Sequence, residues 1–160
     1  MSGKAFSTVV DALLQRLGIR DEVGFSEQEL VLEVDGVDVV LRDGVDGRTL
    51  LVEGPGGALD VSSVSKRSRI EKLLKTNLAL STVHNTISVL VGDAEDTAKF
   101  VNVRGFYRYQ QNDINVLTDL VSDVASSADI LRGVLTNLET EVQYPNVSDR
   151  SENELIFLSP

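Results

Sequence analysis

The one histidine, His84, is the side chain of this 160-residue sequence best suited to transfer a proton near neutral pH. A serine hydrolase built around it would need a nucleophile elbow, and the sequence contains no Gly-x-Ser-x-Gly segment. The chain has no cysteine, so it offers neither a thiolate nucleophile nor a disulfide. We therefore expect no catalytic residues and no enzymatic activity. We interpret His84 as a half-exposed residue between a helix and a strand.

Two acidic clusters resemble metal ligands only superficially. Asp93, Glu95 and Asp96 form one, and Asp43 and Asp46 with two glycines form the other. Neither has the ligand spacing of a calcium-binding loop. The sequence also lacks the ligands of a typical zinc site, because one histidine leaves only carboxylates as further ligands. We predict no metal, a solvated turn at the first cluster and a hairpin turn at the second.

A glycine-rich segment and a group of basic residues are candidates for binding a phosphate or an acidic partner. The segment Gly54-Pro55-Gly56-Gly57 lacks the Gly-Lys-Ser/Thr ending of a P-loop and the spacing of a dinucleotide site. We therefore predict a turn that ends a strand, and no cofactor. The basic residues Lys66, Arg67, Arg69, Lys72 and Lys75 could dock an acidic partner, but we interpret them as a solvated helix face.

Charge narrows the class of partner. The formal net charge is -10, which disfavours binding to nucleic acid or to anionic membrane surfaces because both are negatively charged. No apolar run is long enough for a signal peptide or a membrane-spanning helix. These features predict a cytoplasmic protein.

Periodicity predicts the elements that carry these residues. Apolar residues recur at helical spacing from Phe6 to Leu17, and Gly18 suits the position after a helix end. Three strands follow, with Asp35-Gly36 as a hairpin signal between the first two. The predicted strands span 30–34, 37–41 and 48–53.

The second half of the chain repeats this alternation. A helix is predicted over 68–81, with Ser68 and Glu71 spaced as a capping box. Strands are predicted over 86–91 and 99–109, with Gly105 as a bulge. A long helix is predicted over 113–138.

The element order predicts an α+β fold. Five strands in hairpins give a mostly antiparallel twisted sheet, and three helices pack against it in the order α-β-β-β-α-β-β-α. We expect one domain over residues 1–138. Residues 139–160 are predicted to form an acidic, flexible tail that carries the apolar run Leu155-Ile156-Phe157-Leu158.

The first three strands carry a second apolar set. Leu30, Leu32 and Val34 share the face assigned to the core. Val31, Val40 and Leu51 lie on the opposite face, where isolated exposure and cover by the first helix are the alternatives. If that face is open, these three residues predict a surface that binds another chain.

Three segments resemble the class I type III secretion chaperones, a family of small acidic bacterial proteins. Residues 9–19 resemble the opening helix of the family, which typically ends in Leu-Gly. Residues 73–80 resemble its middle helix, where paired leucines precede Asn-Leu, and residues 114–135 resemble its closing helix. The resemblance extends over residues 4–138, and the tail is a departure from the family.

The resemblance implies a function and a set of partners. Such chaperones are homodimers that bind an extended N-terminal segment of a secreted effector, keep it competent for secretion and deliver it to the secretion ATPase. They use neither nucleotide nor metal. A regulatory protein with the same fold and no secretion role, and an immunity or inhibitor protein for a toxin, are the alternatives.

The second helix carries two apolar stripes, whereas a helix lying on one sheet needs only one. The first stripe runs through Ile70, Leu74 and Leu78, and the other through Leu73, Asn77 and Leu80. One stripe is therefore expected to pack against a second copy, as the resemblance also implies. The predicted dimer interface consists of Ile70, Leu73, Leu74 and Asn77.

Overall fold

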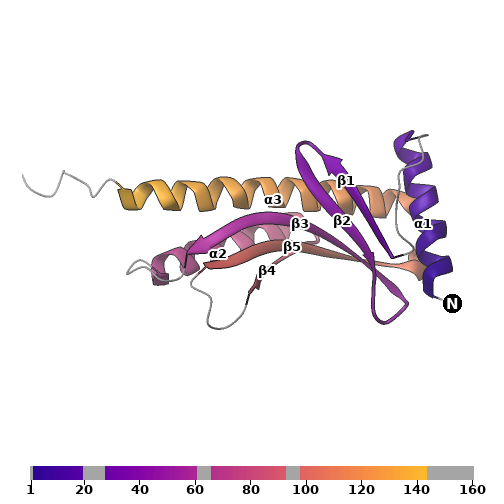
Figure 1. Ribbon diagram of the computed structural model, residues 1–160, viewed down its shortest axis with the longest axis horizontal. Coiled ribbons are helices and arrows are strands. Elements are labelled where there is room, and N and C mark those ends of the chain that lie inside the picture. The colour runs from indigo at the N-terminus through magenta and orange to yellow at the C-terminus, as the bar shows by residue number, and fades with distance from the viewer. Residues whose placement is uncertain (1, 20–27, 61–65, 93–97, 144–160) are drawn as a thin grey trace, which may run out of the picture.

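The computed structural model describes residues 2–19, 28–60, 66–92 and 98–143 as a five-stranded antiparallel sheet with three helices (Figure 1). The sheet order is β1-β2-β3-β5-β4. The strands are β1 (Glu29–Val34), β2 (Val37–Asp43), β3 (Thr49–Asp60), β4 (Ile87–Val91) and β5 (Ala98–Arg108). The helices are α1 (Ser2–Leu17), α2 (Lys66–Val83) and α3 (Ile114–Gln143), and a 3-10 turn spans Tyr109–Gln111. The predicted α+β fold and element order are confirmed.

One face of the sheet is covered by α3, which runs along the length of the sheet (Figure 1). The buried side chains alternate along the strands, as Leu30 and Leu32 do in β1 and Leu50 and Val52 do in β3. They meet a stripe of α3 whose members include Leu117, Val124 and Leu131. The core of the domain lies in this layer.

The other two helices occupy opposite ends of the sheet (Figure 1). Helix α1 packs against α3 and β2, and α2 packs against α3 and the edge strand β4. Helix α1 ends as predicted: Gly18 has φ +72°, and Ile19 N–H donates to the carbonyl of Leu14 at 3.0 Å. The Asp35-Gly36 turn is also confirmed, because both residues have positive φ.

The glycine cluster does not end β3, so that prediction was wrong. The strand continues to Asp60, with a shift in register between Pro55 and Gly57. A Cβ at Gly54 would lie 3.1 Å from Val124 Cγ1, and one at Gly56 would lie 3.0 Å from the carbonyl oxygen of Val101. At Gly54 the strand lies directly beneath α3, and at Gly56 the β5 backbone and Leu131 of α3, 3.4 Å from such a Cβ, together leave little room for a side chain.

The predicted bulge at Gly105 was wrong for the same reason. Gly105 pairs in register with Val52, and a Cβ there would lie 2.5 Å from Leu120 Cδ1. Glycine at this position allows α3 to approach β5 closely. The irregularity of this ladder lies between Pro55 and Gly57 instead.

Two helix boundaries differ from those predicted. Helix α2 begins at Lys66, so Ser68 lies inside the helix and Glu71 pairs with Lys75 at 2.8 Å in place of a capping box. Helix α3 continues to Gln143, beyond the predicted end at 138. The predicted turn at Asp93 to Asp96 and the tail beyond Gln143 lie outside the described residues.

Candidate partner-binding surface

The sheet face opposite α3 carries the three residues that the sequence singled out. Val31 and Val40 are directly opposite each other on β1 and β2. Leu51 is opposite Phe106 on β5. Val31 is 47% exposed and Phe106 is 52% exposed, whereas Val40 and Leu51 are half-buried. These four residues form what we call the outer apolar patch.

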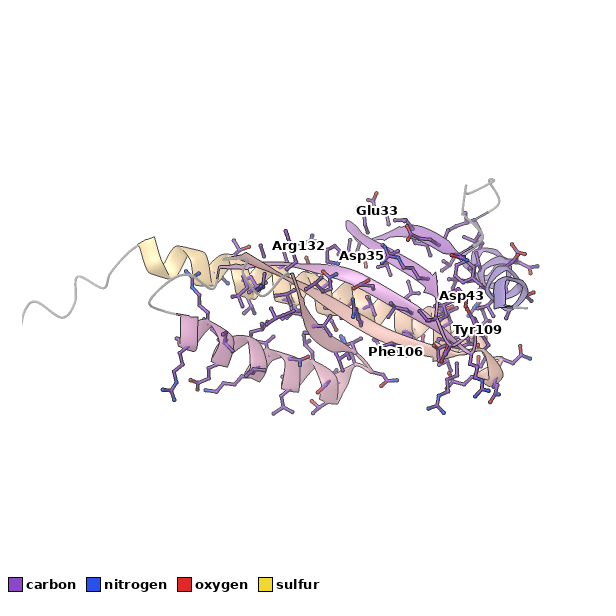
Figure 2. The ribbon with its side chains drawn as sticks, turned by 60° about the horizontal axis from the view of Figure 1, so that its bottom comes forward. Glu33, Asp35, Asp43, Phe106, Tyr109 and Arg132 are labelled. Carbon is purple, nitrogen blue, oxygen red and sulfur yellow. The ribbon has the colours of Figure 1, made fainter. Side chains whose placement is uncertain are left out.

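Phe106 is the member of the outer apolar patch that sequence reasoning missed. It alternates with the buried residues Gly105 and Tyr107, so the period of two in β5 could have placed it on this face. Figure 2 shows it toward the end of the sheet where Asp43 and Tyr109 also lie. Only the pairing of β3 with β5, two strands far apart in sequence, brings it next to Leu51.

A cluster of charged residues occupies the centre of the same face. Arg104 Nε and Asn102 Nδ2 donate to Glu53 Oε1 at 2.8 and 2.9 Å. Arg42 Nη1 lies 3.5 Å from the other Glu53 oxygen, and Arg42 Nε donates to Glu29 at 2.6 Å. Burial acts to raise the pKa of Glu53, but these hydrogen bonds and the two guanidinium charges outweigh it and hold the pKa below its usual range. Glu53 is therefore an ionised, ordered carboxylate.

The tip of the β1–β2 hairpin is acidic. Glu33 and Asp38 are directly opposite each other across the two strands, and Asp35 lies in the turn beyond them. Figure 2 shows Glu33 and Asp35 at this tip. Like charges at directly opposite positions destabilise a pair of strands. The acidic tip lies next to the Val31–Val40 pair and favours a positively charged neighbour.

A second apolar surface lies between α2 and β4. The four predicted dimer residues, Ile70, Leu73, Leu74 and Asn77, all line one groove of about 140 Å³. Its other lining residues come from β4 and β5 and are Ser88, Val89, Leu90 and Val101. We call this hollow the α2–β4 groove.

The structure separates the two stripes of α2. Leu73 and Leu80 are buried, and Asn77 accepts a hydrogen bond from the Ser88 backbone N–H at 2.8 Å. This stripe therefore faces the protein. In the other stripe, Leu74 and Leu78 are 60% and 67% exposed and face solvent, whereas Ile70 is half-buried and packs against the core.

His84 lies between α2 and β4, where the sequence placed it, and contacts α3. Its Nδ1 lies 2.8 Å from Ser127 Oγ, which lies 3.2 Å from Thr86 Oγ1. Ser127 is fully buried and Thr86 nearly so. The three side chains thus connect the end of α2 and the segment before β4 to α3.

The turn between β2 and β3 is stabilised by Asp46, as predicted for a hairpin turn. Its carboxylate accepts hydrogen bonds from the backbone N–H groups of Arg48 and Thr49 and from the Thr49 hydroxyl. These bonds lower the pKa of Asp46. Tyr109 donates to Asp43 at 2.7 Å, and burial together with this bond raises the pKa of the Tyr109 phenol. Both aspartates are thus occupied in structural contacts.

Within the described ranges, no three histidine, cysteine or acidic side chains are grouped as metal ligands. Among the helices of that same part of the chain, none combines the length and the apolar composition needed to cross a membrane.

No family model and no curated protein sequence matches this chain. Solved structures with a similar fold do exist. The Yersinia pestis type III secretion chaperone SycH, in complex with a stable fragment of YscM2, superposes with a TM-score of 0.55 at 16% identity, covering 79% of this chain and 98% of that chain. The heterodimeric complex of ExoU and SpcU from the type III secretion system of Pseudomonas aeruginosa superposes with a TM-score of 0.56 at 19% identity. The match covers 80% of this chain and 98% of that chain.

A third similar structure is the HopA1–SchA chaperone–effector complex, with a TM-score of 0.57 at 13% identity. The match covers 83% of this chain and 97% of that chain. The matched chains are therefore similar over almost their whole length. The element order, the sheet topology and these superpositions together show that the chain has the fold of the class I type III secretion chaperones.

Proposed function

We propose that this chain is a chaperone that binds an extended segment of a secreted effector on the outer face of its sheet. The outer apolar patch supports this function most directly, because its exposed members extend from the edge strand β1 to β5. Exposed apolar side chains on a sheet face are typical of surfaces that bind other chains. The similar structures, which include chaperone–effector complexes, support the same function.

The backbone of β1 offers a second means of attachment. In the described part of the chain, β1 pairs with β2 alone and forms one edge of the sheet. An extended peptide can add to such an edge through main-chain hydrogen bonds, while alternate side chains enter surface patches. Ordering a flexible segment consumes part of the binding energy, so a long contact is needed. A client that pairs with β1 along one stretch and then crosses the outer face past Val31 to Phe106 would use both the strand edge and the patch.

The acidic hairpin tip indicates the charge of the client. A basic side chain placed between Glu33 and Asp38 would relieve the repulsion between these opposed carboxylates. The preferred client segment therefore carries a basic residue close to the apolar residue that contacts Val31.

The proposed chaperone is a homodimer that uses the solvent-facing stripe of α2. A helix that packs on one sheet needs only one apolar stripe, but Leu74 and Leu78 lie outside that stripe and are exposed. Leu90 of β4 extends the apolar surface beside them. Burying this stripe against a second copy would remove it from water. The four residues predicted from the sequence then divide: Ile70 and Leu74 contact the second copy, whereas Leu73 and Asn77 support the helix from beneath.

In this proposal the protein acts in the bacterial cytoplasm without a cofactor or a catalytic step. It binds the N-terminal region of its effector, keeps that region competent for secretion and transfers it to the secretion ATPase. The deeply enclosed Ser127 beside His84 is in keeping with a role that involves no catalysis.

The test begins with affinity purification from the native host and identification of the bound proteins by mass spectrometry. We expect a protein that the host exports, bound through its first segment. A synthetic peptide of that segment should bind with 1:1 stoichiometry per chain and become protected from proteolysis. Capture of proteins that are not exported, or binding that survives removal of the N-terminal segment, would contradict the proposal.

A further inference from the structure

The α2–β4 groove has a volume that suits a single large apolar side chain. A cavity of about 150 Å³ in a protein core can hold a benzene molecule, and this groove measures about 140 Å³. Its rim includes Leu74 and Leu90, which are both exposed. A large aromatic or aliphatic side chain could therefore enter the groove from the solvent side.

Positive charge gathers at the beginning of α2. Residues 66–75 contain five basic residues and one acidic residue, Glu71, in a chain whose net charge is -10. Arg67, Lys72 and Lys75 are exposed. The N-terminal end of a helix adds a partial positive charge of its own. An occupant of the groove that carries acidic residues next to apolar ones would suit both features.

The tail of the same chain has this composition. The apolar run Leu155-Ile156-Phe157-Leu158 directly follows a segment that contains Glu152 and Glu154. The tail begins after Gln143, the last residue of α3, at the end of the molecule where α2 begins (Figure 1). The fourteen positions from Gln143 to Phe157 extend to roughly 45–50 Å, whereas α2 is only about 27 Å long. The apolar run can thus reach any point on α2.

We propose that residues 152–158 dock on the α2–β4 groove of their own chain, with Phe157 in the groove and the two glutamates beside Arg67 and Lys72. The segment then covers Leu74, which is also a member of the proposed dimer stripe. In this respect the inference rests on the proposed function, because the tail and the second copy compete for one surface. The tail thereby sets the concentration at which the chaperone dimerises.

Cross-linking from a single introduced cysteine tests the docking directly, since the natural chain has none. The full-length Ser159→Cys variant is labelled with a benzophenone maleimide, irradiated at low concentration and digested for mass spectrometry. We expect cross-links within one chain to peptides of residues 66–92. A matched protein that also carries Ile156→Asp and Phe157→Asp should lose at least nine-tenths of them.

Several results would overturn the docking. These are cross-links that join two chains, cross-links that fall mainly on β1, β2 or the outer face of β5, and a yield that the two aspartates leave unchanged. The intrachain cross-link is expected whether or not the protein dimerises, so a failure of the proposed dimer is distinguishable from a failure of the docking.

The competition with the second copy has its own measurement. If the tail covers the groove in about nine of ten molecules, the dissociation constant of the dimer rises about 100-fold, because both copies must be open. Sedimentation equilibrium should therefore give a dissociation constant at least tenfold lower for Ile156→Asp/Phe157→Asp than for the natural chain. An equal or higher value would contradict the competition.

Discussion

Leu51 of β3 lies directly opposite Phe106 of β5, and both side chains project from the sheet face that α3 leaves open. The Val31–Val40 pair lies on the same face of β1 and β2. Val40 and Leu51 are diagonal neighbours, because β2 pairs Val40 with Glu53 two positions along β3. The outer apolar patch thus has one residue on each of four strands, beside the Glu53 charge cluster.

Replacing Val31 and Phe106 with aspartate should abolish client binding and spare the fold. Both side chains are about half exposed, so the fold should lose no more than about 1 kcal/mol. A charge beneath a bound apolar side chain should weaken binding by about 2 kcal/mol or more, roughly 30-fold. Titration with the N-terminal peptide of the effector measures this loss, and thermal melting monitors the fold.

Ile130→Asp is the matched control for that variant. Ile130 is 46% exposed, close to Val31, but lies on α3. The Ile130→Asp variant should bind the peptide with the same affinity as the natural protein. Equal weakening by both variants would mean that charge, rather than the outer apolar patch, determines binding. We use Phe106 in place of Leu51 because Leu51 is half-buried and an aspartate there would also disturb the sheet.

The hairpin tip should select clients with a basic residue. Glu33→Gln with Asp38→Asn removes the opposed carboxylates and should raise the stability of the hairpin slightly. The same variant should bind the peptide about fivefold more weakly at low salt, and the difference should shrink as salt screens the charges. Binding that is insensitive to both the variant and the salt concentration would exclude this selection.

Aspartates at Leu74 and Leu78 should convert the dimer to a monomer. These side chains face solvent in the isolated protomer, so its fold should tolerate the change. Light scattering should give twice the chain mass of 17.4 kDa for the natural protein and the chain mass for the variant. Val116→Asp, an exposed position at the beginning of α3, should remain dimeric. A protein that is monomeric at micromolar concentration both as the natural chain and as Ile156→Asp/Phe157→Asp would refute the dimer.

Glycine-to-alanine changes at two positions should shift the unfolding free energy in opposite directions. Gly105→Ala places a methyl group 2.5 Å from Leu120 Cδ1 in the core and should cost about 1–3 kcal/mol of unfolding free energy. Gly133→Ala lies within α3, where an added Cβ meets nothing within 4 Å, and should stabilise by up to about 1 kcal/mol. Urea unfolding at one fixed protein concentration compares them.

A double variant identifies the cause of the loss at Gly105. If the added methyl group clashes with Leu120, then Gly105→Ala/Leu120→Val should be more stable than the sum of the two single changes predicts. Strictly additive losses would show that the close approach of α3 is not what requires glycine at this position.

Glu53→Gln should destabilise the protein at neutral pH but not in acid. The folded state lowers the pKa of Glu53, so its carboxylate stabilises the fold above the unfolded pKa, about 4.3. That contribution is lost as the pH falls through the folded value. The unfolding free energy of the natural protein should therefore exceed that of the variant by about 1–3 kcal/mol at pH 7. This difference should disappear below pH 4.

Glu71→Gln is the control for this pH dependence. Glu71 is exposed and pairs with Lys75 one turn along α2, so its removal should change the unfolding free energy far less than Glu53→Gln does. A gap between the natural protein and Glu53→Gln that stays constant from pH 7 to pH 3 would mean that hydrogen-bond geometry, and not charge, makes Glu53 important.

Local patterns in the sequence determined the elements and their faces. The period of two in β1 distinguished buried Leu30 from exposed Val31, and Asp35-Gly36 specified the first hairpin through positive φ values. Such patterns are readable because they depend on neighbours a few residues away. The element order then sufficed for the fold class.

Only the tertiary structure decided how distant segments meet. The sequence predicts a strand end at Gly54 and a bulge at Gly105, because nothing in it indicates that α3 lies directly above them. The pairing of β3 with β5 placed Phe106 beside Leu51, and the contact of α2 with β4 determined that Leu74 faces solvent and Leu73 does not. These relationships depend on packing between elements separated by tens of residues, for which local periodicity carries no information.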